Sequence, residues 1–121
     1  MAAPNLVNVT SINGKTTGAA LTTVSADLLT CSSDKLLKIN SIIVANIDGT
    51  NAATCDIKFY NNDNTTAYHL CKSANVSAGD TLIVLGKDAP IYLEESDKIQ
   101  GLASAASDLE IIISYEEMDD A

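Results

Sequence analysis

The sequence contains no arginine and no tryptophan, and its 121 residues include only one histidine and one phenylalanine. All seven basic residues are lysines, and sixteen acidic residues bring the formal net charge to −9. Without arginine, the chain lacks the side chain best suited to bidentate phosphate contacts, and its overall field repels polyanions. We therefore expect no direct binding to nucleic acid.

Long hydrophobic runs are also missing. No apolar stretch approaches the roughly 20 residues that a membrane-spanning helix needs. The opening stretch, MAAPNLVNVTS, has neither the basic nor the apolar region of a secretory signal. We expect no membrane association, and synthesis in the cytosol.

The hydrophobic fraction of 46% is enough for a core, which must be mainly aliphatic because aromatic residues make up only 4%. Short apolar blocks separated by turn residues recur along the chain. The clearest example is Thr81–Leu93, in which two apolar blocks flank a turn around Gly86. Blocks of this length are typical of strands and too short for helices. The pattern predicts one domain of residues 1–121, an all-β antiparallel β-sandwich of about eight to ten short strands, immunoglobulin-like or jelly-roll-like.

The two ends of the chain have their own character. Residues 1–5 are expected to form an extended N-terminal arm, because Pro4 restricts their conformation. Leu6–Ile12 follows as a predicted strand that ends at the turn dipeptide Asn13-Gly14. At the other end, residues 116–121 form an acidic tail that we expect to be frayed and solvated.

Three later segments predict strands. Lys35–Ile47 contains a β-branched Ile-Ile-Val block, which favours a strand. Lys98–Ser104 is expected to be a short edge strand kinked at Gly101. Asp108–Tyr115 is predicted to close the domain. The buried face predicted for the first segment consists of Leu37, Ile39, Ile43, Ala45 and Ile47, and that of the last consists of Leu109, Ile111, Ile113 and Tyr115.

Thr54–Tyr60 and Thr65–Lys72 predict a hairpin around residues 61–64. If the loop is centred on Asp63, Cys55 faces Cys71 and Ile57 faces His69, which leaves a metal site and a Cys55–Cys71 disulfide as alternatives. A closed structural zinc site needs four ligands, and a fourth is present only if Cys31 approaches. Directly cross-strand disulfides are geometrically demanding. We therefore expect free, buried thiols.

Two loops contain fragments of calcium-binding motifs, DGTN at 48–51 and NNDN at 61–64. Neither has the full ligand spacing with its distant glutamate. We expect no metal ion and no cofactor.

His69 is the only histidine, so every Ser–His–Asp or Cys–His mechanism would have to use it. The sequence shows no nucleophile elbow around any serine. The carboxylates of Glu94, Glu95 and Asp97 are close together in the sequence, but a turn rich in like charge is normally solvated. We therefore expect that the protein is not an enzyme.

The run from Val76 to Glu117 resembles small β-sandwich virion proteins of tailed bacteriophages, especially those of marine and cyanobacterial phages. The likeness lies in the Ala78-Gly79-Asp80 turn, the Pro-Ile-Tyr-Leu segment that begins at Pro90, and the turn before the last strand, which ends in Ser-Tyr. Ser96 stands where that turn usually has glycine. The earlier motifs Ile-Ile-Val-Ala-Asn and Lys-Phe-Tyr-Asn extend the resemblance to about two-thirds of the chain.

This resemblance implies a non-enzymatic structural protein located in the virion. The first expectation is a capsid decoration or cement protein, a homo-oligomer and more specifically a trimer, that binds the outside of the major capsid protein lattice. A neck, tail or fibre-associated component with a role in host recognition is the alternative, followed by a soluble carbohydrate- or ligand-binding module. The expected contact residues are Ala2, Ala3, Pro4, Asn5 and Leu6 of the arm, and Glu94, Glu95 and Asp97 of the acidic turn.

Overall fold

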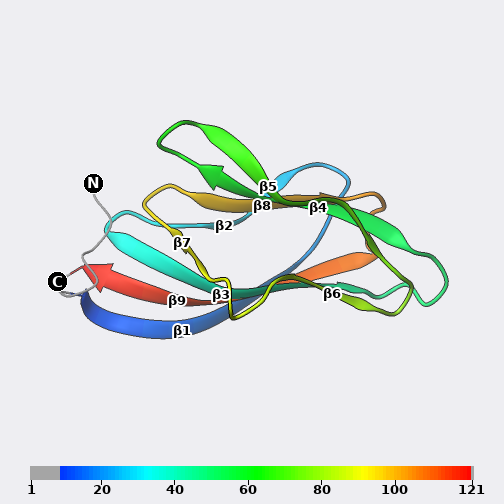
Figure 1. The fold of residues 1–121 in the computed structure, drawn as a ribbon, viewed down its shortest axis with the longest axis horizontal. Helices are drawn as coiled ribbons and strands as arrows, with labels where there is room; N and C mark the ends of the chain where they lie inside the picture. Colours follow the sequence, from blue (N-terminus) through cyan, green and yellow to red (C-terminus); the bar gives the residue numbers. More distant parts are fainter. Residues whose placement is uncertain (1–8, 121) are drawn as a thin grey trace.

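The computed structural model describes residues 9–120, which form nine strands in two antiparallel sheets and no helix (Figure 1). Sheet A contains β1 (Val9–Ala20), β9 (Leu109–Asp120), β3 (Lys35–Asn46), β6 (Thr81–Leu85) and β7 (Ile91–Leu93). Sheet B contains β2 (Ala26–Thr30), β8 (Lys98–Ala103), β4 (Ala53–Asn61) and β5 (Thr66–Val76). The predicted all-β sandwich is confirmed. The predicted arm lies outside the described residues.

The strand pairing defines the topology. β1 pairs with β9, β2 with β8, β3 with β6 and β7, and β4 with β5. The first half of the chain thus forms one long antiparallel ribbon with the second half, and successive pairs of the ribbon alternate between the two sheets. Additional pairing of β3 with β9 and of β4 with β8 completes each sheet. This arrangement is a jelly roll, the second of the two predicted sandwich types.

The core lies between the sheets and is almost entirely aliphatic, as the composition requires. Its largest contributors are alternate residues of the two central strands of sheet A, which face alternate residues of sheet B. The fully buried side chains include Leu37, Ile39, Ile42 and Val44 of β3, Leu109, Ile111 and Ile113 of β9, Ile57 of β4 and Ile99 of β8. The buried face predicted for β9 is confirmed for its three aliphatic residues, and Tyr115 packs against the same core.

A β-bulge in β3 changes which of its side chains are buried. The β3–β9 register shifts between Ile39 and Ser41, so one extra residue is inserted and the alternation reverses. Ile42 and Val44 point into the core, whereas Ile43 and Ala45 point outward. The predicted buried face of β3 is therefore wrong beyond Ile39.

Thr81–Leu93 is an interrupted edge strand. Both β6 and β7 pair antiparallel with β3, the first opposite Ile42–Ala45 and the second opposite Leu37–Ile39. The predicted turn around Gly86 is a loop of residues 86–90 that leaves the sheet at the level of the β3 bulge. β6 and β7 therefore lie end to end along the same neighbouring strand, β3.

Three local predictions are corrected by long-range pairing. β1 continues through Asn13 and Gly14, which lie opposite Glu117 and Glu116, so no turn forms there. The same pairing places residues 116–120 in β9, where we expected a frayed tail. β8 is a central strand between β2 and β4 rather than an edge, and Gly101 is required by packing: a Cβ there would lie 2.8 Å from Cδ1 of Ile57.

The β4–β5 hairpin is confirmed, but its predicted register is wrong. Cys71 lies opposite Ile57, and His69 lies opposite Lys58. Two register shifts on either side of Ile57 produce this offset. The shift places His69 on the outer face of sheet B, away from the thiols.

Candidate interaction surface

The two sheets have different outer faces. On sheet B, charged side chains pair with one another: Asp27 accepts hydrogen bonds from Lys98 at 3.0 Å and from Gln100 at 2.9 Å. The Lys98 ammonium also lies 5.4 Å from the centre of the Tyr60 ring. The hydrogen bond from Gln100, followed by that from Lys98, lowers the pKa of Asp27. Such a face is a solvated surface that is costly to dehydrate.

A second charged group lies on the outer face of sheet B around Asp56. Its carboxylate is 3.8 Å from the Lys72 ammonium and 4.0 Å from Nε2 of His69. It also accepts a hydrogen bond of 2.7 Å from the backbone N–H of Ser73. His69, the only histidine, thus belongs to a solvent-facing charge cluster.

The outer face of sheet A carries a strip without any charged side chain. Two neighbouring rows of outward residues cross the sheet, and cross-strand pairing identifies their members. The apolar row contains Gly18, Ile112, Ile43 and Ile83, and the hydroxyl row contains Thr16, Ser114 and Ser41. We call these seven residues the uncharged strip. In a chain with a net charge of −9, a strip of this kind is a candidate contact surface.

The apolar row is open to solvent. Ile83 is 68% exposed and Ile112 is 41% exposed, while Ile43 between them is half-buried. In the adjacent row the hydroxyl groups of Thr16 and Ser114 lie 3.3 Å apart and satisfy each other. Water is therefore easily removed from the strip, since neither row holds an ion that would lose its hydration.

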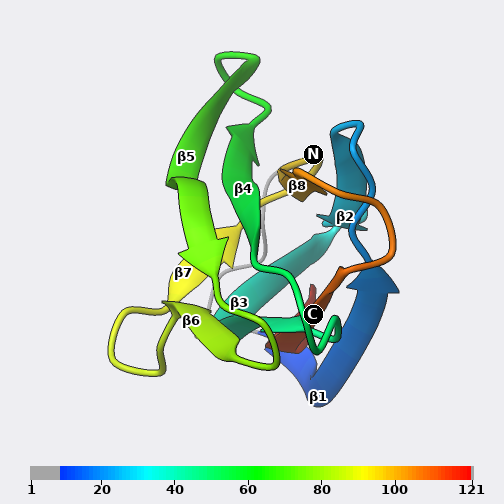
Figure 2. The same ribbon diagram turned by 90° about the vertical axis from the view of Figure 1, so that its right-hand side faces the viewer.

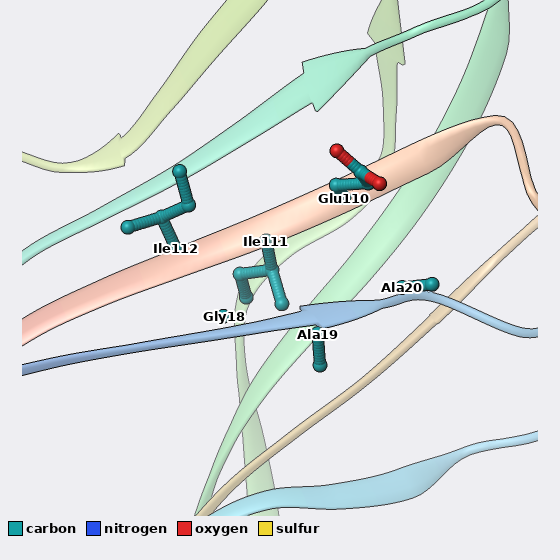
Figure 3. Close-up of a pocket in the computed structure, with 6 residues that line it drawn as sticks. All are labelled: Gly18, Ala19, Ala20, Glu110, Ile111 and Ile112. Atoms are coloured by element: carbon teal, nitrogen blue, oxygen red, sulfur yellow. The ribbon is translucent and has the colours of Figure 1, made fainter.

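A shallow hollow of about 290 Å³ adjoins the strip on β1 and β9 (Figure 3). It exists because Gly18 has no side chain and Ala20 has only a methyl group, whereas Glu110 and Ile112 stand beside them on β9. An apolar side chain from a partner would fit there.

The predicted acidic contact turn has a mainly structural role. Asp97 is only 4% exposed, and its two carboxylate oxygens accept hydrogen bonds from the backbone N–H groups of Asn62 at 2.9 Å and Glu94 at 3.0 Å. Glu95 accepts a 3.1 Å hydrogen bond from the N–H of Asp34. Of the three predicted carboxylates, only that of Glu94 belongs to an exposed residue. The predicted arm residues Ala2, Ala3, Pro4, Asn5 and Leu6 lie outside the described residues.

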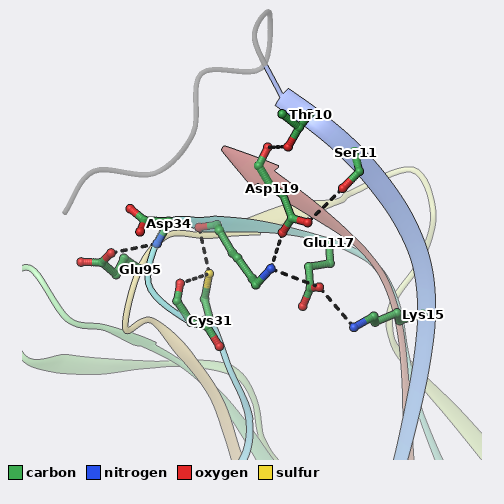
Figure 4. Close-up of polar contacts among 10 residues, drawn as sticks. Thr10, Ser11, Lys15, Cys31, Asp34, Glu95, Glu117 and Asp119 are labelled. Atoms are coloured by element: carbon green, nitrogen blue, oxygen red, sulfur yellow. Dashed lines mark hydrogen bonds and ion pairs between the residues drawn. The ribbon is translucent and has the colours of Figure 1, made fainter. Parts of the chain in front are cut away.

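The acidic end of β9 is held by lysines (Figure 4). Lys35 bonds to Asp119 and lies 3.7 Å from Glu117, which also contacts Lys15 at 3.2 Å. Ser11 donates a hydrogen bond of 2.9 Å to Asp119. The bond to Asp119 raises the pKa of Lys35, and the same bond lowers the pKa of Asp119. These contacts tie β1, β3 and β9 together, so this acidic segment is part of the sandwich.

Cys31, Cys55 and Cys71 are free thiols, and the predicted free state is the one observed. Cys71 lies against β4, where its sulfur is 3.9 Å from the carbonyl oxygen of Cys55. A hydrogen bond from the Cys55 thiol lowers the pKa of Cys71 below its usual value, and burial raises the pKa of Cys31 to about 11. Among residues 9–120, no three histidine, cysteine or acidic side chains gather in a way that could hold a metal ion.

The loop at 48–51 uses its carboxylate internally. Asp48 accepts hydrogen bonds from the backbone N–H groups of Thr50 at 2.8 Å and Asn51 at 3.2 Å. These bonds, that from Thr50 first, hold the pKa of Asp48 below its usual value. The aspartate therefore shapes the turn.

The uncharged strip was not predicted from the sequence. Regular alternation would bury Ile43, and only the β3 bulge places it on the outer face. A partial signal was present, since Ile112 interrupts the polar side of an otherwise alternating strand. Assembling the strip requires knowing that β1, β9, β3 and β6 are neighbours in this order.

The described residues include no helix long and apolar enough to cross a membrane. The chain defines a jelly-roll sandwich with one charged outer face and one outer face that carries the uncharged strip. Comparison with family models gives no match, and none of the curated proteins matches the sequence.

Solved structures do share the fold. A protein of the disulfide-linked pili that form Bacillus endospore appendages aligns with a TM-score of 0.52 and 16% identity, over 92% of this chain and 88% of that one. The Drosophila NLP core, studied for pentamer formation and histone binding, aligns with a TM-score of 0.52 and 10% identity, over 90% and 100%. A pentameric capsid protein from metagenomic phage sequences aligns with a TM-score of 0.36 and 14% identity, over 95% and 67%, which is too distant for an argument. The first two similarities show the fold alone.

Proposed function

We propose that this protein is a non-enzymatic structural component of a phage particle, a capsid decoration or cement protein that attaches to the outside of the major capsid protein lattice through the uncharged strip. The observation that carries the proposal is the contrast between the two outer faces. Sheet B pairs its charges in solvent, whereas sheet A crosses four strands with a strip that loses little hydration on contact.

Three further observations support this proposal. The resemblance of Val76–Glu117 to phage virion proteins indicates the setting. The two solved structures with a TM-score of 0.52 come from a pilus and from a pentamer-forming protein, so the same fold is compatible with assembly. The position of His69 within the Asp56 cluster gives it a surface role, which agrees with a protein that binds rather than catalyses.

Contact through the uncharged strip has a consequence for salt dependence. Attraction between surface charges is largely screened beyond about 10 Å at 0.1 M salt, whereas apolar contact is not weakened by screening. Attachment through the strip should therefore persist as salt is raised. Attachment through the acidic turn at Glu94 and Glu95 should weaken under the same conditions.

The test is the substitution Ile83→Asp, assayed by cosedimentation with expanded heads that lack the protein. Removing one buried isoleucine from an interface costs about 1.5–3 kcal/mol, so binding should weaken by about tenfold to a hundredfold. Val24→Asp is the matched control, because Val24 is 71% exposed and lies in the loop between β1 and β2, away from the strip. Unchanged binding by Ile83→Asp, or an equal loss with Val24→Asp, would contradict this assignment of the surface.

Copy number separates the decoration role from its alternative in the neck or tail. Quantitative mass spectrometry of purified particles should give a number that scales with the capsid subunits. A number matching a single vertex or a tail ring would favour the neck, tail or fibre role. Binding on a glycan array without binding to heads would favour a carbohydrate-binding module.

A further inference from the structure

Among residues 9–120, the two sheets have four strand edges without a neighbouring strand, those of β1 and of β6 with β7 in sheet A, and those of β2 and β5 in sheet B (Figure 2). A free edge presents unpaired backbone N–H and C=O groups and can take up another strand, and proteins usually interrupt such edges. The four edges can therefore be compared by what interrupts them.

Three of the four edges are interrupted. β2 has only five residues and a register shift between Asp27 and Leu29. β5 has two register shifts, and its residue Ser73 has a left-handed φ of 50°. The remaining edge of sheet A is divided into β6 and β7 by residues 86–90, which include Pro90.

β1 is uninterrupted over most of its length. It has twelve residues, and its pairing with β9 is regular from Ser11 to Ala20. Its far side pairs with no strand among residues 9–120. The strand contains no proline and a single charged residue, Lys15, whose ammonium contacts Glu117 at 3.2 Å. β1 is thus a long edge that nothing in the described part of the chain protects.

We propose that β1 pairs antiparallel with β1 of a second copy of this chain about a two-fold axis at Thr16, joining the two A sheets into one. Thr16 then lies opposite Thr16 of the partner copy, and Ile12 lies opposite Ala20. The paired segment is residues 12–20 of each copy, about 30 Å of strand. It excludes the register shift near Val9.

Charge excludes the neighbouring register with its axis at Lys15. In a two-fold antiparallel pair, outward side chains lie opposite outward side chains only if the residue on the axis lies opposite the same residue of the partner copy. An axis at Lys15 would place two lysines directly opposite each other, which is destabilising. An axis at Thr16 places Lys15 opposite Thr17, so its contact with Glu117 is kept, and it creates a favourable Thr–Thr pair at the centre.

Shape favours the same register. Ile12 lies opposite Met118 on the outer face of β1 and is still 58% exposed, so it can gain a further apolar contact. In the proposed pair it stands about 4.5–5.5 Å from Ala20 of the other copy. Ala20 borders the hollow of about 290 Å³ above Gly18, so the isoleucine side chain leans into it. Because of the two-fold symmetry, the contact between Ile12 and Ala20 occurs twice in the dimer. An axis at Gly14 would put Ile12 opposite Thr16 and leave both hollows empty.

The proposed pairing has a geometric consequence for the surface. The two-fold axis runs perpendicular to the sheet, so both copies present the same outer face. The hydroxyl row of one copy then continues through Thr16 into that of the other. The result is a closed dimer with a doubled uncharged strip. A trimer would require a separate contact.

The first test is sedimentation equilibrium of the full chain. The wild type should show a reversible monomer–dimer equilibrium. Ile12→Asp should raise the dimer Kd by about tenfold for each of its two contacts, about a hundredfold in total. Ile47→Asp is the matched control because Ile47 is 57% exposed and lies outside the strands, so its Kd should equal that of the wild type. A wild type that stays monomeric, or equal Kd values for the two variants, overturns the proposal.

The second test checks the register directly. In Thr16→Cys the two introduced thiols face each other across the axis, so a short bismaleimide should link them into a dimer on a denaturing gel. Thr66→Cys, at an exposed residue that begins the other long edge strand β5, is the control. Peptide mapping identifies the linked residues and separates them from Cys71. Cross-linking of Thr16→Cys no greater than that of Thr66→Cys overturns the register. A wild-type protein that binds heads but stays monomeric would show that only this inference fails, whereas a wild-type dimer that does not bind heads would count against the proposed function alone.

Discussion

Gly101 offers a sharp test of the packing between β8 and β4. A methyl group added by Gly101→Ala would lie 2.8 Å from Cδ1 of Ile57, 3.1 Å from Cδ1 of Leu28 and 3.1 Å from the carbonyl oxygen of Asp56. The two side-chain atoms can move at some cost. The carbonyl oxygen belongs to the backbone of β4 and can move only if the strand moves.

The expected loss follows from two opposing effects. Inserting a carbon into a packed core costs about 1–3 kcal/mol. Replacing glycine by alanine in a strand returns about 0.5–1 kcal/mol of conformational entropy. The net destabilisation should therefore be about 1 kcal/mol, which lowers the Tm of a domain of this size by about 3–6 °C.

Thermal and urea unfolding, followed by circular dichroism, provide the assay. Gly14→Ala is the matched control, because Gly14 also lies in a strand, a Cβ added to it would meet no atom within 4 Å, and the variant should gain stability slightly. In the double variant Gly101→Ala with Ile57→Val, Cδ1 of Ile57 is removed. The valine substitution, which costs about 0.5–1.5 kcal/mol alone, should cost less in this background.

The result that refutes this reasoning is a Gly101→Ala variant at least as stable as the wild type. An equal loss with Gly14→Ala would also refute it, because backbone freedom rather than close packing would then explain both glycines. Additive effects of Gly101→Ala and Ile57→Val would show that Cδ1 is not the obstructing atom.

Two further predictions concern Cys71 and Asp97. Cys71 should be alkylated by iodoacetamide at a rate that rises with pH and reaches half its maximum at a lower pH than that of an ordinary thiol, because only the thiolate reacts and the hydrogen bond from the Cys55 thiol lowers the pKa of Cys71. Cys31, whose pKa is about 11, should stay unmodified in the folded protein, and mass spectrometry over a pH series that showed equal rates would count against both assignments. Asp97→Ala should cost about 1–3 kcal/mol in urea unfolding, because the N–H groups of Asn62 and Glu94 lose their acceptor. Glu94→Ala on the same turn should stay within about 0.5 kcal/mol of the wild type, and equal effects would show that the Asp97 carboxylate is not the anchor.

Where a strand is regular, its faces could be predicted from the sequence. Alternation before Tyr115 correctly assigned Leu109, Ile111 and Ile113 of β9 to the core. Where a strand carries a bulge, the prediction failed, as in β3 beyond Ile39. A bulge depends on how two distant strands fit against each other, so a local pattern does not reveal it.

The acidic turn contains one feature that the sequence indicated and one that it did not. The resemblance identified Ser96 as a serine in place of a glycine, and the structure gives this residue a left-handed φ of 69°. Serine at this position thus adopts a left-handed backbone conformation that glycine would adopt freely. The burial of Asp97 was not predictable, because it depends on Asn62, which lies 35 residues away in the chain.

The sequence by itself determined that this protein is an aliphatic, acidic, all-β sandwich, because short apolar blocks with a period of two can bury their side chains in no other way. Only the tertiary structure decided that the sandwich is a jelly roll and that Asn13 and Gly14 continue a strand. It also decided which residues form the uncharged strip and which edge is unprotected. The physical reason is that these features arise from pairing between distant segments, as in the contact of Lys15 with Glu117, 102 residues apart. The turn or strand propensity of a few residues contributes too little free energy to outweigh a complete ladder of such pairs.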